Sequence, residues 1–247
     1  MILNNFRPVS VFQWLKALGI QFLALSLFSC NKTAEINANK SFVGMTHVAY
    51  GVGPLNLFLD SSSLFPTPID FGQTSGVPGY PYDTVVSRIN YMQVKQDAEI
   101  LLFGNAAFQQ GSYYSIFVFD TLGKNSMNLI ILQNSQPVRT DTFTYIRYMN
   151  YSPGTSLGLF LTNAKDTLRQ FSPRPFVGDN PNPQSYVFTQ VHIGKYGAIA
   201  YSSDSTAWIV DSITINKSTN YNVYLQGFAF DTTSGINKLQ LKSVPLN

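Results

Sequence analysis

A ten-residue pattern occurs twice in the chain. "PLNLFLDSSS" (residues 54–63) and "SLGLFLTNAK" (156–165) place their leucines in the same register at an offset of 102 residues. Residues 108–119 align with 215–226 at an offset of 107, and "NLIILQ" aligns with "KLQLKS" at 110. A slowly changing offset is expected when two copies of one unit have acquired loops of different length. The chain is therefore predicted to contain two copies of one structural unit.

Within each copy the residue pattern is that of β-strands. The repeated leucines recur at every second position, which gives one apolar face of period two: Leu55, Leu57 and Leu59, then Leu157, Leu159 and Leu161. Runs such as "YYSIFVF" and "YVFTQVHI" are rich in β-branched and aromatic residues and are separated by Gly, Pro, Asn and Ser. The sequence predicts an all-β chain of two tandem immunoglobulin-like antiparallel β-sandwiches, at residues 42–137 and 138–247. The polar segment 134–141 marks the boundary between two separable domains.

The first thirty residues have the layout of a secretory signal. They contain no acidic residue, carry Arg7 and Lys16, and run apolar from Ala17 to Phe28. Cys30, the single cysteine of the chain, follows in Leu27-Phe28-Ser29-Cys30, which resembles the bacterial lipobox. We expect residues 1–29 to be a lipoprotein signal peptide and residues 30–41 to be a polar tether lipidated at Cys30.

A lipid on Cys30 predicts a location. Each buried methylene adds about 0.8 kcal/mol of membrane affinity, so two or more acyl chains hold a protein firmly. Asn31 follows the cysteine, whereas the inner-membrane retention signal of enteric bacteria has Asp there. The outer membrane of a Gram-negative bacterium is therefore the expected location, with the periplasmic and surface leaflets both left open. The covalent lipid is the only cofactor-like group expected.

The charge composition argues against nucleic acid as a partner. Removal of the leader takes away Arg7 and Lys16, so 14 of the 16 basic residues remain against 13 acidic ones. No stretch clusters Lys and Arg as a phosphate-binding surface requires. The mature chain also has no cysteine pair for a disulfide, so its stability must come from apolar cores.

Residues 145–168, "YIRYMNYSPGTSLGLFLTNAKDTL", resemble the opening of the bacterial domain-of-unknown-function family 4397. The matching features are Arg147, Asn150, Ser152-Pro153 and the alternating strand around Leu159. The first copy keeps the strand and Pro54, has Thr46 or His47 in place of the arginine, and lacks the serine. The resemblance implies tandem immunoglobulin-like sandwiches on secreted or anchored proteins, and it carries no catalytic residues.

A search for catalytic or metal-binding constellations finds none. His47 and His192 fall in separate copies and in predicted strands, so we interpret both as ordinary hydrogen-bonded strand residues. The sequence has no GxSxG, phosphate-loop, HExxH or calcium-loop pattern. We expect no catalytic residues, no metal site and no enzymatic activity.

Aromatic residues in loops are the remaining candidates for ligand contact. Tyr80 and Tyr82 lie in a Pro/Gly-rich loop of the first copy, Phe176 lies in the corresponding loop of the second, and Trp208 begins a strand. Rigid exposed aromatics can stack on sugar rings or anchor a protein partner. The alternative is that these side chains cover the ends of the sandwiches, and that interpretation is favoured.

Two functions stay open at this point. The first is a non-enzymatic, envelope-anchored lipoprotein that acts as an adhesion-like interaction or structural module, with an envelope protein as its partner. The second is a glycan-binding accessory lipoprotein for polysaccharide capture. Exposure of the loop aromatics on one end of the molecule would favour the second function.

Overall fold

The alternating and β-branched segments form strands, and the computed structural model contains no α-helix among the residues it describes. These are residues 39–246 without 78–79, 122–125, 136, 138–139, 164–168, 180–181, 184–185, 205, 217–218 and 230–237. No membrane-spanning helix is found in this part of the chain. From Lys40 onward the described residues form one structural unit.

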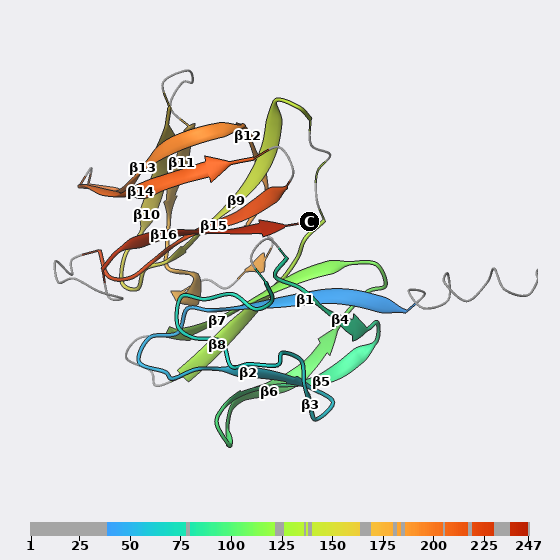
Figure 1. Cartoon of the computed structure of the whole chain (residues 1–247). Helices are drawn as coiled ribbons and strands as arrows, with labels where there is room; N and C mark the ends of the chain where they lie inside the picture. The colour runs from blue at the N-terminus through green and yellow to red at the C-terminus, as the bar shows by residue number, and fades with distance from the viewer. Residues whose placement is uncertain are drawn as a thin grey trace, which may run out of the picture. The chain divides into compact units, whose positions relative to one another are not determined.

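The first sandwich consists of eight strands: β1 (Lys40–His47), β2 (Asn56–Leu59), β3 (Ser62–Ser63), β4 (Asp83–Val86), β5 (Ile89–Gln96), β6 (Glu99–Ala107), β7 (Tyr113–Thr121) and β8 (Ser126–Gln133). They form two four-stranded sheets, with strand orders β4-β1-β7-β8 and β3-β2-β5-β6 (Figure 1).

The second sandwich repeats this arrangement with β9 (Phe143–Tyr151), β10 (Leu157–Thr162), β11 (Arg169–Arg174), β12 (Thr189–His192), β13 (Gly194–Ser202), β14 (Ala207–Ile215), β15 (Asn220–Gln226) and β16 (Gln240–Leu246). A 3₁₀ turn, η1 (Val177–Asp179), follows β11. The sheet orders are β12-β9-β15-β16 and β11-β10-β13-β14, so each strand has its counterpart eight strands later. The predicted all-β sandwich fold is confirmed. The structure adds one parallel pair to each sandwich, β1 with β7 and β9 with β15.

Equivalent residues of the two sandwiches make equivalent hydrogen bonds. The hydroxyl of Tyr114 in β7 accepts from the backbone N–H of Gln109 at 2.9 Å, and that of Tyr221 in β15 accepts from Asn216 at 3.1 Å. Tyr114 and Tyr221 are 107 residues apart, and so are Gln109 and Asn216; this is the offset that the sequence alignment predicts. Equivalent residues of β8 and β16 are 112 positions apart according to the strand pairing, whereas the sequence alignment predicts an offset of 110. An error of two residues preserves the face on which each side chain lies, because the period of a strand is two.

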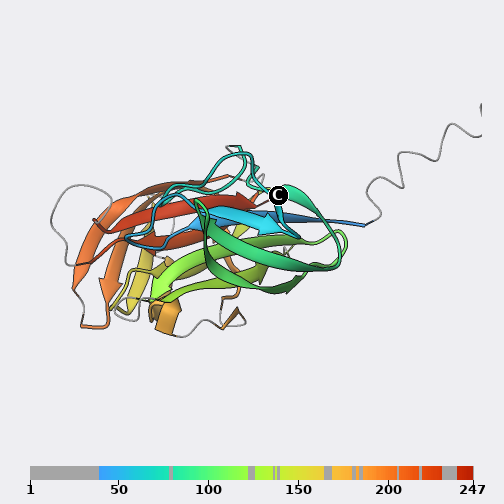
Figure 2. The ribbon, with the colours of Figure 1, turned by 90° about the horizontal axis from the view of Figure 1, so that it is seen from below.

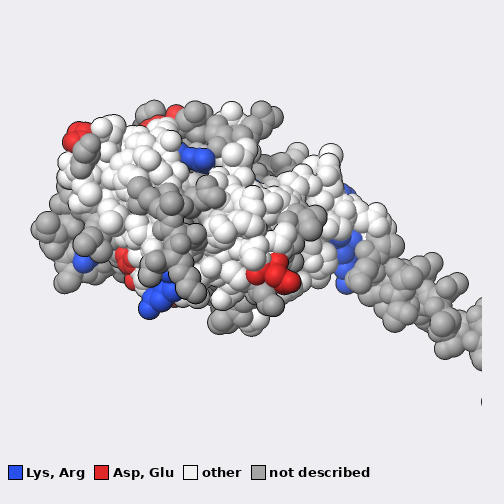
Figure 3. All heavy atoms as spheres, turned by 90° about the horizontal axis from the view of Figure 1, so that it is seen from above, with Lys and Arg blue, Asp and Glu red and all other residues white. Residues whose placement is uncertain are grey.

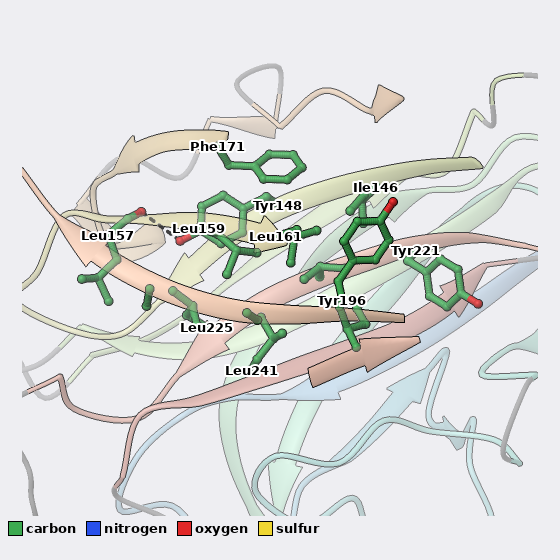
Figure 4. Close-up of a cluster of buried hydrophobic side chains, with 14 of the residues drawn as sticks. Ile146, Tyr148, Leu157, Leu159, Leu161, Phe171, Tyr196, Tyr221, Leu225 and Leu241 are labelled. Carbon is green, nitrogen blue, oxygen red and sulfur yellow. Dashed lines mark hydrogen bonds between the residues drawn. The ribbon is translucent and has the colours of Figure 1, made fainter. Parts of the chain in front are cut away.

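Each sandwich encloses its own apolar core. The core of the second contains Leu157, Leu159 and Leu161 of the repeated pattern, all fully buried (Figure 4). The hydroxyl of Tyr148 donates to the carbonyl of Leu157 at 2.8 Å, so this tyrosine is buried without an unpaired polar atom. Leu55, Leu57 and Leu59 hold the same positions in the first core.

A third core lies between the sandwiches. The sheets β4-β1-β7-β8 and β12-β9-β15-β16 bury side chains between them as well as toward their own sandwich. Figure 1 shows the second sandwich above the first, and Figure 2 shows the same ribbon from below, where the strands of the two sandwiches overlap. The Phe117 ring stacks on Tyr151 with centroids 5.1 Å apart and meets the edge of Tyr224 at 5.5 Å. All three side chains are at most 1% exposed. A fully buried aromatic contact of this kind resembles the interior of one domain more than a hinge.

We predict that the two sandwiches unfold together. Phe117→Ala removes the central ring of the third core, and we expect it to lower the free energy of unfolding by about 3–5 kcal/mol. Calorimetry should show one transition for the native chain and two separated transitions for the variant. Two resolved transitions in the native chain, or a stable fragment of about 11 kDa in limited proteolysis, would instead support the separable domains predicted from the sequence.

Candidate functional site

Two of the aromatic residues proposed for ligand contact are buried. Tyr82 is 4% exposed, its hydroxyl accepts from the Asn134 side chain at 2.9 Å, and its ring packs edge-on against Tyr113. Phe176, also 4% exposed, packs against Phe119 in the third core. These two predictions of ligand contact are corrected: residues next to β4 and η1 turn both rings inward, Tyr82 against Asn134 and Tyr113 and Phe176 into the third core.

Of the other three predicted site residues, Tyr80 is exposed, and the side chains of Trp208 and Cys30 lie outside the described part of the chain. Tyr80 is 38% exposed and lines a surface hollow of about 390 Å³ with Pro66, Pro68 and Asp83. Trp208 lies in β14, but its side chain lies outside the described residues, as does the whole of Cys30. Of the proposed aromatics, only Tyr80 is thus shown at the surface.

His47 has a structural role that its counterpart in the second sandwich explains. Its Nδ1 accepts from the backbone N–H of Ala49 at 3.2 Å, and its Nε2 therefore donates to the carbonyl of Gly53. The pairing registers of β1 and β9 make Asn150 the equivalent residue, and Asn150 accepts from the N–H of residue 152 and donates to the carbonyl of residue 155. The neutral imidazole thus braces the turn after its strand as an amide does. No group of three or more potential metal ligands occurs in the described part of the chain.

Protonation of His47 should destabilise the protein. Burial lowers the pKa of His47 below its ordinary 6.5, against the opposing effects of the Gly53 hydrogen bond and the Asp70 carboxylate. The unfolded chain therefore takes up a proton as the pH falls through 6.5, while the folded chain does not, and stability falls with pH by at most about 1.4 kcal/mol per unit. We expect His47→Asn to remove this contribution and keep both hydrogen bonds. Urea denaturation between pH 5 and 8 measures it, and an unchanged pH dependence in the variant would contradict the prediction.

The largest concentration of exposed apolar side chains lies on the outer sheet of the first sandwich. Ile89 and Tyr91 of β5 and Ile100 and Phe103 of β6 form what we call the apolar outer face. Ile89 is 70% and Phe103 is 74% exposed. In the sheet Phe103 stands opposite Gln93, whose other neighbour is Phe58. Lys95 extends its ammonium over the Phe58 ring at 4.3 Å, and the exposed ion pair of Arg88 with Asp60 adjoins the Ile89 end of the face.

At the positions equivalent to Ile89 and Tyr91, the second sandwich has no large apolar side chain. Phe58 pairs with Gln93 and Phe160 pairs with Ile199, so the register places Lys195 where the first sandwich has Ile89 and Gly197 where it has Tyr91. Phe160 is itself covered by Tyr201, with ring centroids 4.2 Å apart. Among the described residues of the second sandwich, Val187 is the only large hydrophobic side chain that is strongly exposed. At the β5 positions the apolar outer face is therefore a property of one copy. The position of Phe103 is held in β14 by Ile209, whose side chain lies outside the described residues.

The sequence analysis missed this face because it looked for aromatics in loops. A signal was present: "INYMQV" is apolar at both the odd and the even positions, whereas a strand with one solvent-facing side alternates. Elsewhere charge is sparse. Figure 3 shows Lys, Arg, Asp and Glu scattered among uncharged residues on the face drawn.

A comparison with known protein families and with curated proteins finds no match to this chain. The resemblance to domain-of-unknown-function family 4397 therefore stays a prediction. The structure corrects one detail of that alignment, since the residue of β1 equivalent to Arg147 is Gly44 and neither Thr46 nor His47.

Proposed function

We propose that the protein is a non-enzymatic lipoprotein of the bacterial outer membrane that binds a protein partner through the apolar outer face. The observation that carries this proposal is the exposure of Ile89, Tyr91, Ile100 and Phe103 on one sheet surface. Monomeric proteins seldom leave such side chains together in water, and patches of this kind mark interaction sites.

The chemistry of the face favours a protein over a glycan. Two of its four side chains are isoleucines, which have no flat ring to stack on a sugar and whose burial contributes about 1.5–3 kcal/mol each in an apolar contact. Tyr91 and Phe103 are residue types that serve as buried anchors in protein interfaces. The amide of Gln93 and the ammonium of Lys95 supply polar groups beside them.

The lipid on Cys30 would set where this face acts. Nine residues, 31–39, separate Cys30 from β1, so an extended chain from Cys30 to Lys40 reaches about 35 Å at most. The sandwiches would thus stay close to the membrane while retaining freedom to turn. The third core joins them into a single body, which allows the face to be presented at a fixed distance from the second sandwich.

The anchor is tested by Cys30→Ala. We expect the variant to lose palmitate labelling and to leave the membrane fraction, because it has no other thiol that could be acylated. Cell fractionation with radiolabelled palmitate measures both effects. Membrane retention and labelling equal to those of the native chain would rule out lipidation at this residue.

The partner surface is tested in intact cells with a photo-crosslinking residue at position 103 or, as a matched control, at position 195 on the outer sheet of the second sandwich. We expect protein adducts at 103 that exceed those at 195 by roughly tenfold. In the chain that carries the crosslinker at 103, Ile89→Lys with Ile100→Ser should abolish the adduct and leave the melting temperature within about 2 °C, because both side chains are exposed. Ile89→Lys places in the first sandwich the residue that the second has there.

Tyr80→Ala separates the two candidate functions. It removes an exposed aromatic from the same sandwich but away from the apolar outer face, so it should leave the protein adduct at 103 unchanged. The hollow beside Tyr80, with Pro66, Pro68 and Asp83, is the observation that keeps glycan binding as the alternative. Equal adduct yields at 103 and 195, together with glycan-array binding that Tyr80→Ala removes, would overturn the protein-partner proposal in favour of that alternative.

A further inference from the structure

We propose that a second hollow, beside the third core, binds a small carboxylate with an apolar or aromatic body, and that Arg147 pairs with the carboxylate. The hollow has a volume of about 450 Å³ and is lined by Arg147 together with Leu132, Pro137, Tyr186, Val187 and Phe188 among others. It is built from both sandwiches and is distinct from the apolar outer face and from the Tyr80 hollow. The proposal is independent of the lipid anchor and of the protein partner.

Arg147 is held rigidly in β9 at the wall of this hollow. It is 3% exposed, and Nε donates to Asn222 Oδ1 at 2.8 Å. Nη1 donates to the carbonyl of Gln133 at 3.3 Å, and Nη2 donates to Asn134 Oδ1. The side chains of Asn134 and Asn222 both donate in turn to the hydroxyl of Ser115. The network therefore ends on β7 of the first sandwich.

The guanidinium has donors to spare. Three of its five N–H groups have partners among the described residues, which leaves two. The Phe188 ring covers one face of the group at 4.7 Å from the guanidinium carbon. Because all five N–H bonds lie in the guanidinium plane, a ring on the face leaves the edge accessible to an acceptor.

The charge of Arg147 is not neutralised. Its hydrogen-bond acceptors are amide and peptide oxygens, and none of the described residues that line the hollow is acidic. The neighbouring residues that the structure leaves undescribed (136, 138–139, 180–181 and 184–185) include no Asp or Glu either. Burial lowers the pKa of Arg147 to about 10, so the group still carries its charge at neutral pH. An isolated buried charge costs several kcal/mol, and an anion in the hollow would offset that cost.

The walls indicate the rest of the ligand. Leucine, proline, valine and phenylalanine side chains line the hollow with Gln133, Ser135 and Tyr186, so the ligand needs a largely apolar body that fits beside a single charge. The two N–H groups of Arg147 that have no described partner suit the two oxygens of a carboxylate. The first sandwich has no second such site, because Gly44 is the equivalent residue and a Cβ there would lie 2.5 Å from the carbonyl oxygen of Pro81.

The test uses phenylacetate as the probe and phenylacetamide, its uncharged twin, as the control ligand. Ligand-observed NMR titration of the full mature protein in detergent gives both affinities. We expect saturable binding of phenylacetate, at least roughly tenfold tighter than that of the amide and weakened by salt.

Val187→Glu supplies the decisive variant. Val187 is 61% exposed at the rim of the hollow, so the substitution places a negative charge beside Arg147 without disturbing a core. It should weaken phenylacetate binding at least roughly tenfold, while Val187→Gln should change it less than about twofold. Arg147→Lys should also weaken binding, because one ammonium cannot replace the planar fork.

Three results would overturn the proposal. They are equal affinities for the acid and the amide, an unchanged affinity in Val187→Glu, and no saturable binding of phenylacetate below about 10 mM. Any of them would leave Arg147 as a residue that only joins the two sandwiches, with Asn134 and Asn222 as its structural partners.

Discussion

The two middle sheets, β4-β1-β7-β8 and β12-β9-β15-β16, are buried on both faces, and the rest of the structure depends on this constraint. Every residue of β15 is buried, and so are most residues of β9. A sheet with two apolar faces must be covered on each side. One face of each middle sheet is covered by the outer sheet of the same sandwich, and the other face is covered by the middle sheet of the other sandwich. The stack of four sheets therefore follows from the burial of both faces of β7, β9 and β15, with Asn222 of β15 hydrogen-bonded to Ser115 across the sandwiches beside the apolar contacts. The rigid relation between the sandwiches follows from the stack.

The two copies have kept one hydrogen-bonding plan while changing residue types. His47 and Asn150 brace the same turn with different chemistry, and the hydroxyls of Tyr114 and Tyr221 tie down the same loop. Where the copies differ most, the difference has a physical consequence. Gly44 lets the Pro81 backbone close over β1, whereas Arg147 places a charge at the same point of β9. The registers of β4 and β12 place Val187 and Phe188 of the second copy at the positions of Pro81 and Tyr82, and there they line the site that we propose for a carboxylate.

The surface of the molecule shows the same divergence. Both outer sheets have the same strand order, so the fold does not require apolar side chains on their solvent faces. The second sandwich has Lys195 and Gly197 there, and the first has Ile89 and Tyr91. A difference between two copies under the same structural constraint is better evidence for an interaction surface than exposure alone, because the second copy shows what the fold tolerates. Interaction through a sheet face and a hollow also fits a fold that presents surfaces on a rigid frame.

The sequence by itself determined the all-β class, the strand positions and the repeat, because period-two alternation and a constant register are local properties that survive in the linear order of residues. It also supplied the lipoprotein signal, which remains a prediction. Only the tertiary structure decided what covers each face. Tyr80 and Tyr82 are two residues apart in one loop, yet one is exposed and the other is sealed beneath Asn134 and Tyr113. The unneutralised charge of Arg147 was equally out of reach. A sequence pattern shows which residues share a face, but whether that face meets water or another sheet depends on segments a hundred residues away.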